Sequence, residues 1–315
     1  MKIGIIGAGA VGAAIARSLV QPGGLNPEVI IIDQMEARAH GLAEDMASAA
    51  ILLSSATCRS GKYDALTSAD LVIVTAGVNE KAGGATDRND PRGRRVLIPA
   101  NAKVMSEVAP AIAAAAPGAV ILVVTDPPDP LAEVVRLLAP NNPVVSAGTV
   151  IDSLRFRFNI ARELGVRVQD VQAQIIGEHG TSSVFIWSSA TVAGTPVLEL
   201  LAQKGDVDAA RSRIESIVRF GNISVIEGIG ASQHGIGAVV GRIAEHIVSD
   251  SHAVLTVANH VPEFETTISL PSIVGKAGVK RSFVPQISAD ERQALEDSAA
   301  ILREASEQAR NAATC

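Results

Sequence analysis

Short apolar runs rich in Val and Ile alternate with Ala-rich amphipathic stretches through the first half of the chain. Uninterrupted apolar runs of this kind are typical of parallel strands that are buried on both faces. The strands predicted from them are 2–6, 29–32, 71–74, 120–124 and 144–145. The helices predicted between them are 11–19, 36–50, 98–116 and 131–138. This alternation predicts the α/β class, with a doubly wound parallel sheet over residues 1–146.

From about residue 151 the pattern changes to longer helical stretches and alternating strand-like runs. The predicted helices are 206–227 and 237–249, and the predicted strands are 184–192, 253–258 and 264–274. Ser288 and Glu291 have the spacing of a capping box and open a closing amphipathic helix. These elements predict a second, α+β domain over residues 147–315, in keeping with about 150 residues per domain.

The stretch 76–99 interrupts the rhythm of the first half. It is polar, rich in Gly and Arg, and longer than connections between secondary-structure elements normally run. Long loops of this composition are often lids over a binding site, and we expect a lid here.

Composition narrows the class of protein. The 27 Lys and Arg against 33 Asp and Glu leave a net charge of −6, without the basic excess of a nucleic-acid binder. The apolar runs are too short to span a bilayer, so neither nucleic acid nor membrane is an expected partner. The two cysteines, Cys58 and Cys315, make neither a disulfide framework nor a metal cluster. Without a signal-peptide pattern, we expect a cytoplasmic protein that binds no metal.

Gly7, Gly9 and Gly12 form a G-x-G-x-x-G motif directly after the first predicted strand and at the start of the first helix. In that context the motif is typical of a Rossmann domain that binds a dinucleotide at the helix N-terminus. Asp33 ends the second strand, 21 residues beyond Gly12, where a carboxylate binds ribose hydroxyls and repels a 2′-phosphate. The motif therefore predicts NAD as the cofactor; the alternative is a glycine-rich turn without a ligand.

Three polar residues in the second half are candidates for acid–base chemistry. His179 follows the apolar run QIIG, and Asp152 could hold its ring in one tautomer and raise its pKa. Arg155 lies one helical turn beyond Asp152 and suits bidentate capture of a carboxylate. The alternatives are a structural histidine and an intrahelical Asp–Arg ion pair.

These motifs together resemble those of the L-lactate and malate dehydrogenases, NAD-dependent 2-hydroxy acid dehydrogenases. The resemblance covers nearly the whole chain and is closer to the lactate branch. It is carried by GAGAVG, the strand-end aspartate, TAG, TDPPDPL, GTVIDSLRFRF and IIGEHG.

The resemblance implies a role for each matching residue. His179 and Asp152 would form a proton relay, Arg155 would bind the substrate carboxylate, and hydride would pass to or from C4 of nicotinamide. The NAD-binding residues implied are Gly7, Gly9, Val11, Gly12, Asp33, Thr75, Ala76, Gly77 and Val124.

The family also carries a lid arginine that polarises the substrate carbonyl, in a pattern R-x-x-L-x-x-x-N. Arg94 matches this pattern in RRVLIPAN, at the cost of about eight extra residues after Lys81. Arg88 needs a shorter insertion but lacks the Leu and Asn, and it remains an alternative together with Arg95. A solvated charged loop is the alternative for the whole cluster.

The chain departs from the family at three substrate-facing positions. Glu80 stands where lactate enzymes have Gln and malate enzymes have Arg, Asp126 replaces an Asn, and Ser232 replaces a Thr. A carboxylate at position 80 repels the second carboxylate of oxaloacetate, which argues against malate. We expect a 2-oxo acid with an amino or guanidino group; the alternative is a solvent-facing Glu80 paired with Lys81 or a loop arginine.

The predicted function is the NAD-dependent interconversion of an L-2-hydroxy acid and its 2-oxo acid, as in L-lactate dehydrogenases. Two alternatives remain: an imine reductase acting on a cyclic imino acid, and an inactive dinucleotide-binding paralogue. By resemblance to the family, we expect a homodimer or homotetramer.

Overall fold

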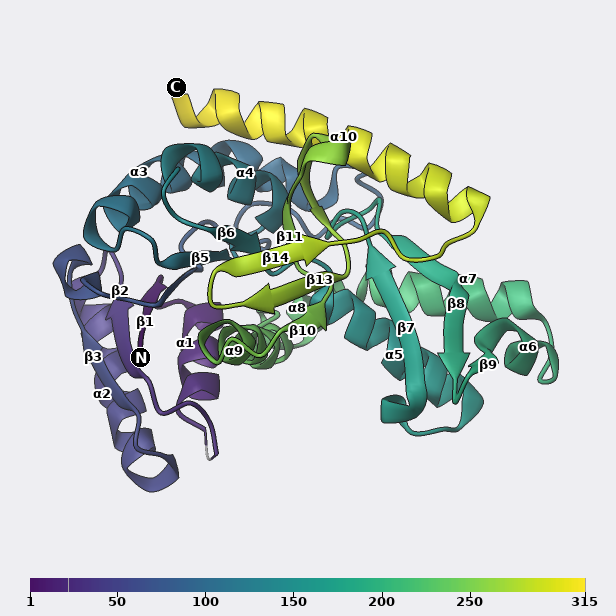
Figure 1. Cartoon of the computed structure of the whole chain (residues 1–315), viewed down its shortest axis with the longest axis horizontal. Coiled ribbons are helices and arrows are strands. Elements are labelled where there is room, and N and C mark those ends of the chain that lie inside the picture. The colour runs from purple at the N-terminus through teal and green to yellow at the C-terminus, as the bar shows by residue number, and fades with distance from the viewer. Residues whose placement is uncertain (22, 315) are drawn as a thin grey trace.

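The computed structural model describes residues 1–21 and 23–314, and its largest element is an eight-stranded sheet (Figure 1). The strand order is β12-β11-β6-β5-β4-β1-β2-β3, and the six strands from β6 to β3 are parallel. These six are β1 (Lys2–Ile6), β2 (Glu28–Ile32), β3 (Thr57–Ser60), β4 (Leu71–Val74), β5 (Val120–Val123) and β6 (Val144–Ser146). The antiparallel strands β11 (Ala258–Val261) and β12 (Thr266–Ser269) extend one edge. The predicted parallel sheet is confirmed.

Helices cover both faces of this sheet, as the uninterrupted apolar strands require. One face carries α1 (Ala10–Leu19), α2 (Glu36–Leu53) and α9 (His234–Val248), which share one hydrophobic core. The other face carries α3 (Ile98–Ala115), α4 (Pro128–Leu138) and the long α10 (Ala289–Thr314). The doubly wound layer therefore includes helices from both halves of the chain.

The remaining elements form a second body beside the sheet. A three-stranded antiparallel sheet of β7 (Val171–Ile176), β8 (Val184–Val192) and β9 (Thr195–Pro196) packs on helices α5, α6 and α7. Their bounds are Val150–Leu164, Val197–Ala202 and Val207–Arg219, and α8 (Gly221–Ile229) follows directly. The third sheet joins β10 (Ala253–Leu255), β13 (Ser272–Gly275) and β14 (Gly278–Ser282).

Three predicted elements of the second half are divided in the structure. The helix predicted over 206–227 ends at Arg219, because Phe220 leaves helical geometry and serves as the boundary of both α7 and α8. The runs 253–258 and 264–274 each contain two strands that belong to different sheets. Apolar periodicity does not reveal such a change of sheet, because it indicates strand character without showing which sheet a strand joins.

The closing helix forms as predicted. The Glu291 backbone N–H donates to Ser288 Oγ at 3.2 Å, and the Ser288 N–H donates to Glu291 Oε2 at 2.9 Å, which completes the capping box. Leu295, Ala299 and Leu302 are buried on its inner face. In the described part of the chain, no helix is long and apolar enough to cross a membrane.

Candidate active site

A pocket of about 750 Å³ opens where the carboxyl ends of β4 and β5 meet the start of α5. Parallel strands place their carboxyl ends along one edge, which is where open α/β sheets bind ligands. Ten of the predicted site residues line it: Val11, Thr75, Gly77, Glu80, Arg94, Val124, Asp126, Arg155, His179 and Ser232. The other predicted residues do not face the pocket directly; of these, Asp152 lies within its wall, behind His179.

The glycine motif makes a turn that other residues would block. Gly7 has φ +107°, and a Cβ there would lie 2.7 Å from the Ala76 backbone nitrogen. A Cβ on Gly12 would lie 2.0 Å from the Gly7 carbonyl oxygen, so α1 can approach the turn only with glycine at this position. The requirement for glycine is therefore steric, as the motif predicts.

The space beside this turn fits a dinucleotide. Nothing lies within 4 Å of the position that a Cβ on Gly9 would take, and Gly9 caps α1 without a side-chain hydrogen bond. The first amide groups of α1 are thus free for an anion. Asp33 sits next to the turn, where its carboxylate accepts from the N–H groups of Ala8 (2.7 Å) and Met35 (2.8 Å).

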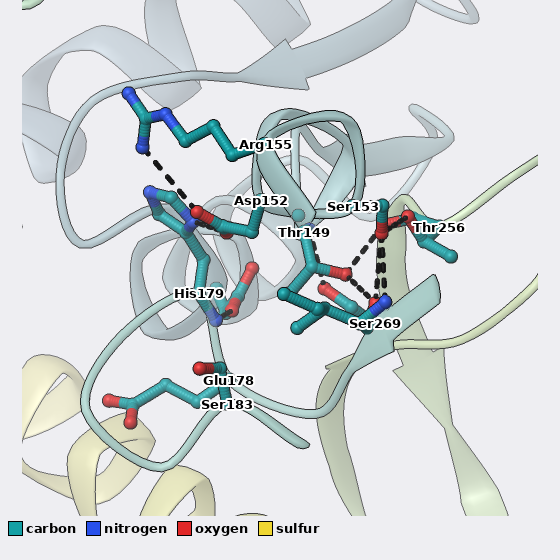
Figure 2. A network of polar contacts seen from close by, with 12 residues as sticks. Thr149, Asp152, Ser153, Arg155, Glu178, His179, Ser183, Thr256 and Ser269 are labelled. Atoms are coloured by element: carbon teal, nitrogen blue, oxygen red, sulfur yellow. Dashed lines mark hydrogen bonds and ion pairs between the residues drawn. The ribbon is translucent and has the colours of Figure 1, made fainter. Parts of the chain in front are cut away.

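His179 and Asp152 meet in the wall of the pocket, as Figure 2 shows. Nδ1 of the ring is hydrogen-bonded to Asp152 Oδ2, and both side chains are about nine-tenths buried. Burial disfavours the charged ring, but the Asp152 carboxylate outweighs burial and raises the pKa of His179. Burial likewise opposes ionisation of Asp152, but His179 and two arginines lower its pKa to about 2. The pair therefore holds a proton at the histidine and a fixed charge behind it.

A buried hydroxyl network fixes the helix that carries Asp152 (Figure 2). Thr149, just before α5, donates to the Ile175 carbonyl at 2.5 Å, and Ser153 Oγ accepts from the Ile175 N–H at 2.9 Å. Ser153 also meets Thr256 at 3.1 Å. These contacts join α5 to β7, whose end leads directly into the His179 loop. The His–Asp geometry is thus set by the core and not by the two side chains alone.

Arg155 lies on the same face of α5 as Asp152, with Nη1 3.6 Å from Asp152 Oδ1. Its side chain also lines the pocket and is 21% exposed. Burial lowers the pKa of Arg155, although it stays charged at any ordinary pH. Arg155 therefore forms the intrahelical ion pair and also faces the pocket, so these two predicted roles are compatible.

The structure separates the three arginines of the predicted lid. Arg94 Nε lies 3.3 Å from Asp126 Oδ2 inside the pocket, without hydrogen-bond geometry, so this buried Nε has no hydrogen-bond partner among the described residues. Burial alone would lower the pKa of Arg94, but the surrounding carboxylates, Asp126 foremost, raise it. Arg88 instead pairs with Glu227 at 2.6 Å, and Arg95 pairs with Glu178 at 3.5 Å. Of the three, Arg94 is the one that enters the pocket where the other candidates meet.

Glu80 lies in the pocket wall and not on open surface. A turn holds it there, with the Ala85 N–H donating to the Glu80 carbonyl at 2.8 Å. Burial and the neighbouring Asp126 carboxylate raise the pKa of Glu80 to about 7, against a smaller opposing effect of Arg94. Within the described residues, no ion pair within 4.0 Å includes Glu80.

Two buried residues that sequence reasoning missed also shape the site. Asp129 is 1% exposed and accepts from the His179 backbone N–H at 2.8 Å and from Ser146 Oγ at 2.7 Å. Asn101 donates to the backbone carbonyls of Asp126 and Val78, and so ties the lid to the strand-end turn. Asn101 carried a signal as the last residue of the arginine pattern, whereas Asp129 lies in the TDPPDPL run, which did not reveal its contact with His179.

A glycine-rich dinucleotide cradle opposite a His–Asp pair and two partly buried arginines defines a nicotinamide-dependent oxidoreductase. Residues 1–146 match the family described as lactate/malate dehydrogenase, NAD binding domain, and residues 149–313 match its alpha/beta C-terminal domain. The chain therefore belongs to the lactate/malate dehydrogenase family and is an NAD-dependent dehydrogenase.

Individual relatives agree over nearly the full length. L-lactate dehydrogenases of Deinococcus radiodurans and Thermus aquaticus are each 40% identical to this chain, over 96% of it and 97% of their own length. The minor L-lactate dehydrogenase of Enterococcus mundtii superposes with a TM-score of 0.88 at 28% identity, covering 97% of each chain. The malate dehydrogenase of Cryptosporidium parvum gives 0.90 at 26%, covering 98% of this chain and 99% of its own. Similarity to both activities means that the fold alone does not select the substrate.

Proposed function

We propose that this enzyme interconverts an L-2-hydroxy acid and its 2-oxo acid, with His179 as proton donor and acceptor. The observation that carries the proposal is the His179–Asp152 pair in the wall of a pocket that also holds Arg94 and Arg155. Because Asp152 is hydrogen-bonded to Nδ1, the other ring nitrogen, Nε2, exchanges the proton with the substrate oxygen. His179 Nε2 lies 3.9 Å from Asp126 Oδ1. Bound NAD supplies the two-electron acceptor or donor at its nicotinamide ring.

In the reductive direction His179 Nε2 gives its proton to the carbonyl oxygen, and Asp152 stabilises and orients the imidazolium beforehand. Arg155 binds the substrate carboxylate through its planar fork. Arg94 places its unsatisfied Nε and its charge at the carbonyl oxygen, where negative charge develops. Oxidation reverses these steps, with neutral His179 taking the hydroxyl proton.

The cofactor contacts follow from the cradle described above. The backbone of the Gly7–Gly12 turn and the start of α1 receive the pyrophosphate, and Asp33 receives the ribose hydroxyls. Val11, Thr75, Ala76, Gly77 and Val124 line the way from this turn toward His179. A 2′-phosphate would meet the Asp33 carboxylate, so NAD is preferred over NADP.

The substrate side chain is the finer part of the proposal. Glu80 faces the pocket with no cation of its own, since Arg94 is closer to Asp126. A dicarboxylate would place a second negative charge beside Glu80, at a cost of about 2 to 4 kcal/mol for a partly shielded pair. We therefore propose a monocarboxylic 2-oxo acid, and one with an amino or guanidino group in preference to a neutral side chain.

NADH oxidation by the purified protein tests both parts. The panel contains pyruvate, oxaloacetate, longer neutral 2-oxo acids, the 2-oxo acids of ornithine and arginine, and a cyclic imino acid. Reduction of any 2-oxo acid supports the reaction, and kcat/KM highest for the cationic members supports the side-chain assignment. Turnover of the cyclic imine alone would favour an imine reductase, and NADH binding without any turnover would favour an inactive paralogue.

Glu80→Gln is the variant that isolates the side-chain assignment. It removes the charge, keeps the size, and is expected to narrow the ratio of kcat/KM between cationic and neutral substrates by about tenfold. Asp87→Asn is the matched control, because Asp87 is an exposed acid on the same segment. An unchanged order of substrates in Glu80→Gln contradicts a role of Glu80 in specificity.

We also propose that the enzyme is a homodimer or homotetramer. Ile51 and Leu52 at the end of α2 are 82% and 88% exposed, and Phe158 on α5 and Ile229 on α8 are 56% and 59% exposed. Large apolar side chains exposed on helices are typical of subunit interfaces. Light scattering after size exclusion measures the mass directly, and a particle of 32.5 kDa would be a monomer.

A further inference from the structure

Residues 82–93, here called the inserted segment, reach from Glu80 across to helix α8. Arg88 makes a two-pronged ion pair with Glu227, with Nη1 2.6 Å from Oε1 and Nη2 2.8 Å from Oε2. Nη2 also donates to Ser224 Oγ at 3.2 Å. Both partners lie on α8, more than 130 residues away in sequence. The guanidinium therefore fixes the segment to another element and not to itself.

A second contact lies at the other end of the segment. Thr181 Oγ1, two residues beyond His179, donates to the Pro91 carbonyl at 3.1 Å. Thr181 is held in turn by Arg219, which donates to its carbonyl at 2.7 Å. Arg94, three residues beyond Pro91, is the arginine that enters the main pocket.

Between these two contacts the segment covers a second cavity of about 650 Å³. Arg94 and Asn222 line both this cavity and the main pocket, and Arg88 lines the cavity. Apart from Ala85, the residues of the segment are half-buried or exposed. Because little apolar surface is buried beneath it, the segment depends on its polar contacts to stay over the site.

We propose that Arg88 is a positioning residue: its ion pair with Glu227 holds the inserted segment on α8 and thereby keeps Arg94 in the pocket. The proposal rests on the proposed function for the role of Arg94. The other ion pair in the segment, Arg92 with Asp90 at 2.8 Å, lies within the segment and cannot fasten it to the rest of the protein. The segment thus contains one arginine that anchors it to α8, Arg88, and one that does not, Arg92.

Hydrogen exchange of the full-length protein with NADH tests the fastening without any substrate. In Arg88→Gln and in Glu227→Gln, amides of 82–93 should exchange about 2- to 5-fold faster than in the unchanged protein, as expected for an exposed ion pair. The double reversal Arg88→Glu with Glu227→Arg should restore slow exchange. Arg92→Gln, the matched control, should exchange as the unchanged protein does.

Kinetics then test the link to Arg94. With the preferred 2-oxo acid, kcat/KM should fall by a similar factor in each single variant and recover in the double reversal, while the NADH dissociation constant stays constant. Raising the salt concentration should bring the unchanged protein toward the single variants, because screening weakens exposed ion pairs.

The outcomes separate this proposal from the proposed function. The fastening role is wrong if the amides of 82–93 exchange at the same rate in Arg88→Gln and Arg92→Gln. It is also wrong if they exchange as fast in the double reversal as in the single variants. Faster exchange with unchanged kcat/KM overturns the link to Arg94 and leaves the dehydrogenase assignment intact. Absence of turnover in all proteins, with the exchange pattern as expected, contradicts the proposed function alone.

Discussion

Two walls of the same pocket are built in opposite ways. The wall from α5 and the His179 loop is largely buried, and its main groups are held by the core: Asp152 through the network around Ser153, and the His179 backbone by Asp129. The facing wall, from Glu80 to Arg95, is largely exposed and is held by ion pairs and single hydrogen bonds. The first wall is fixed before any ligand arrives, and the second depends on contacts that cost little to break.

The difference separates two tasks. Proton transfer requires a donor held within a fraction of an ångström and a fixed charge behind it, which a rigid wall supplies. Admission and selection of a substrate require a wall that opens and can change its residues without unfolding the core. Of the three residues that depart from the family pattern, Glu80 lies on this second wall. Variants on the rigid wall should therefore affect the reaction for every substrate, and variants on the lid should affect substrates differently.

The largest expected effect comes from His179. His179→Gln removes the proton donor and should lower kcat by about 10³-fold or more for every substrate, while the NADH dissociation constant changes little. Steady-state assays measure kcat, and fluorescence titration measures the NADH dissociation constant. His246→Gln, half-buried on α9 and outside the pocket, is the control. Loss of NADH binding in His179→Gln would mean that the ring supports the cofactor site and not the chemistry.

Asp152→Asn should have the second-largest effect, a fall in kcat of about 10²-fold or more. The Asp152 carboxylate raises the pKa of His179, so its removal lowers that pKa. Reduction needs protonated His179, and the alkaline limb of its pH profile should therefore move to lower pH. A limb that stays in place would show that another group controls it.

Asp129→Asn tests whether the buried charge of Asp129 destabilises the folded protein. Burial raises the pKa of Asp129 from 3.8 to about 6, so the cost of ionising it in the folded state grows as the pH rises from about 4 and is complete above about 6. The variant should gain up to about 3 kcal/mol of unfolding free energy at pH 7.5, and the gain should shrink as the pH falls from 6 toward 4. Urea unfolding at several pH values measures this. A variant that is less stable at pH 7.5 would mean that the charged hydrogen bond to His179 outweighs desolvation.

The smallest effect is expected for Glu80 and depends on the substrate. Its pKa of about 7 means that it loses its charge as the pH falls through neutrality. KM for a neutral 2-oxo acid should fall between pH 8 and pH 6, and KM for a cationic one should rise, each by about tenfold or less. Glu80→Gln should remove both trends. Parallel trends for the two substrates would place the titrating group elsewhere.

Local pattern was sufficient for the elements whose environment is uniform along their length. The parallel strands, the glycine turn and the closing helix with its Ser288–Glu291 box formed as predicted, because each depends on neighbours in sequence. The helix over 206–227 and the two divided strand runs did not, because their ends are set by contacts with other sheets. Arg88 and Arg94 could not be separated by spacing, since an insertion leaves the register of a loop open.

By itself, the sequence determined the class of fold, the dinucleotide turn and the set of residues able to hold a proton and a carboxylate. These follow from periodicity and from steric demands such as those at Gly7 and Gly12, which act over a few residues. Only the tertiary structure decided which arginine enters the pocket, that Glu80 faces it, and that Asp129 supports His179. The contacts of Arg94 with Asp126 and of His179 with Asp129 join positions 32 and 50 residues apart. Their energies depend on burial, which exists only once the chain has folded.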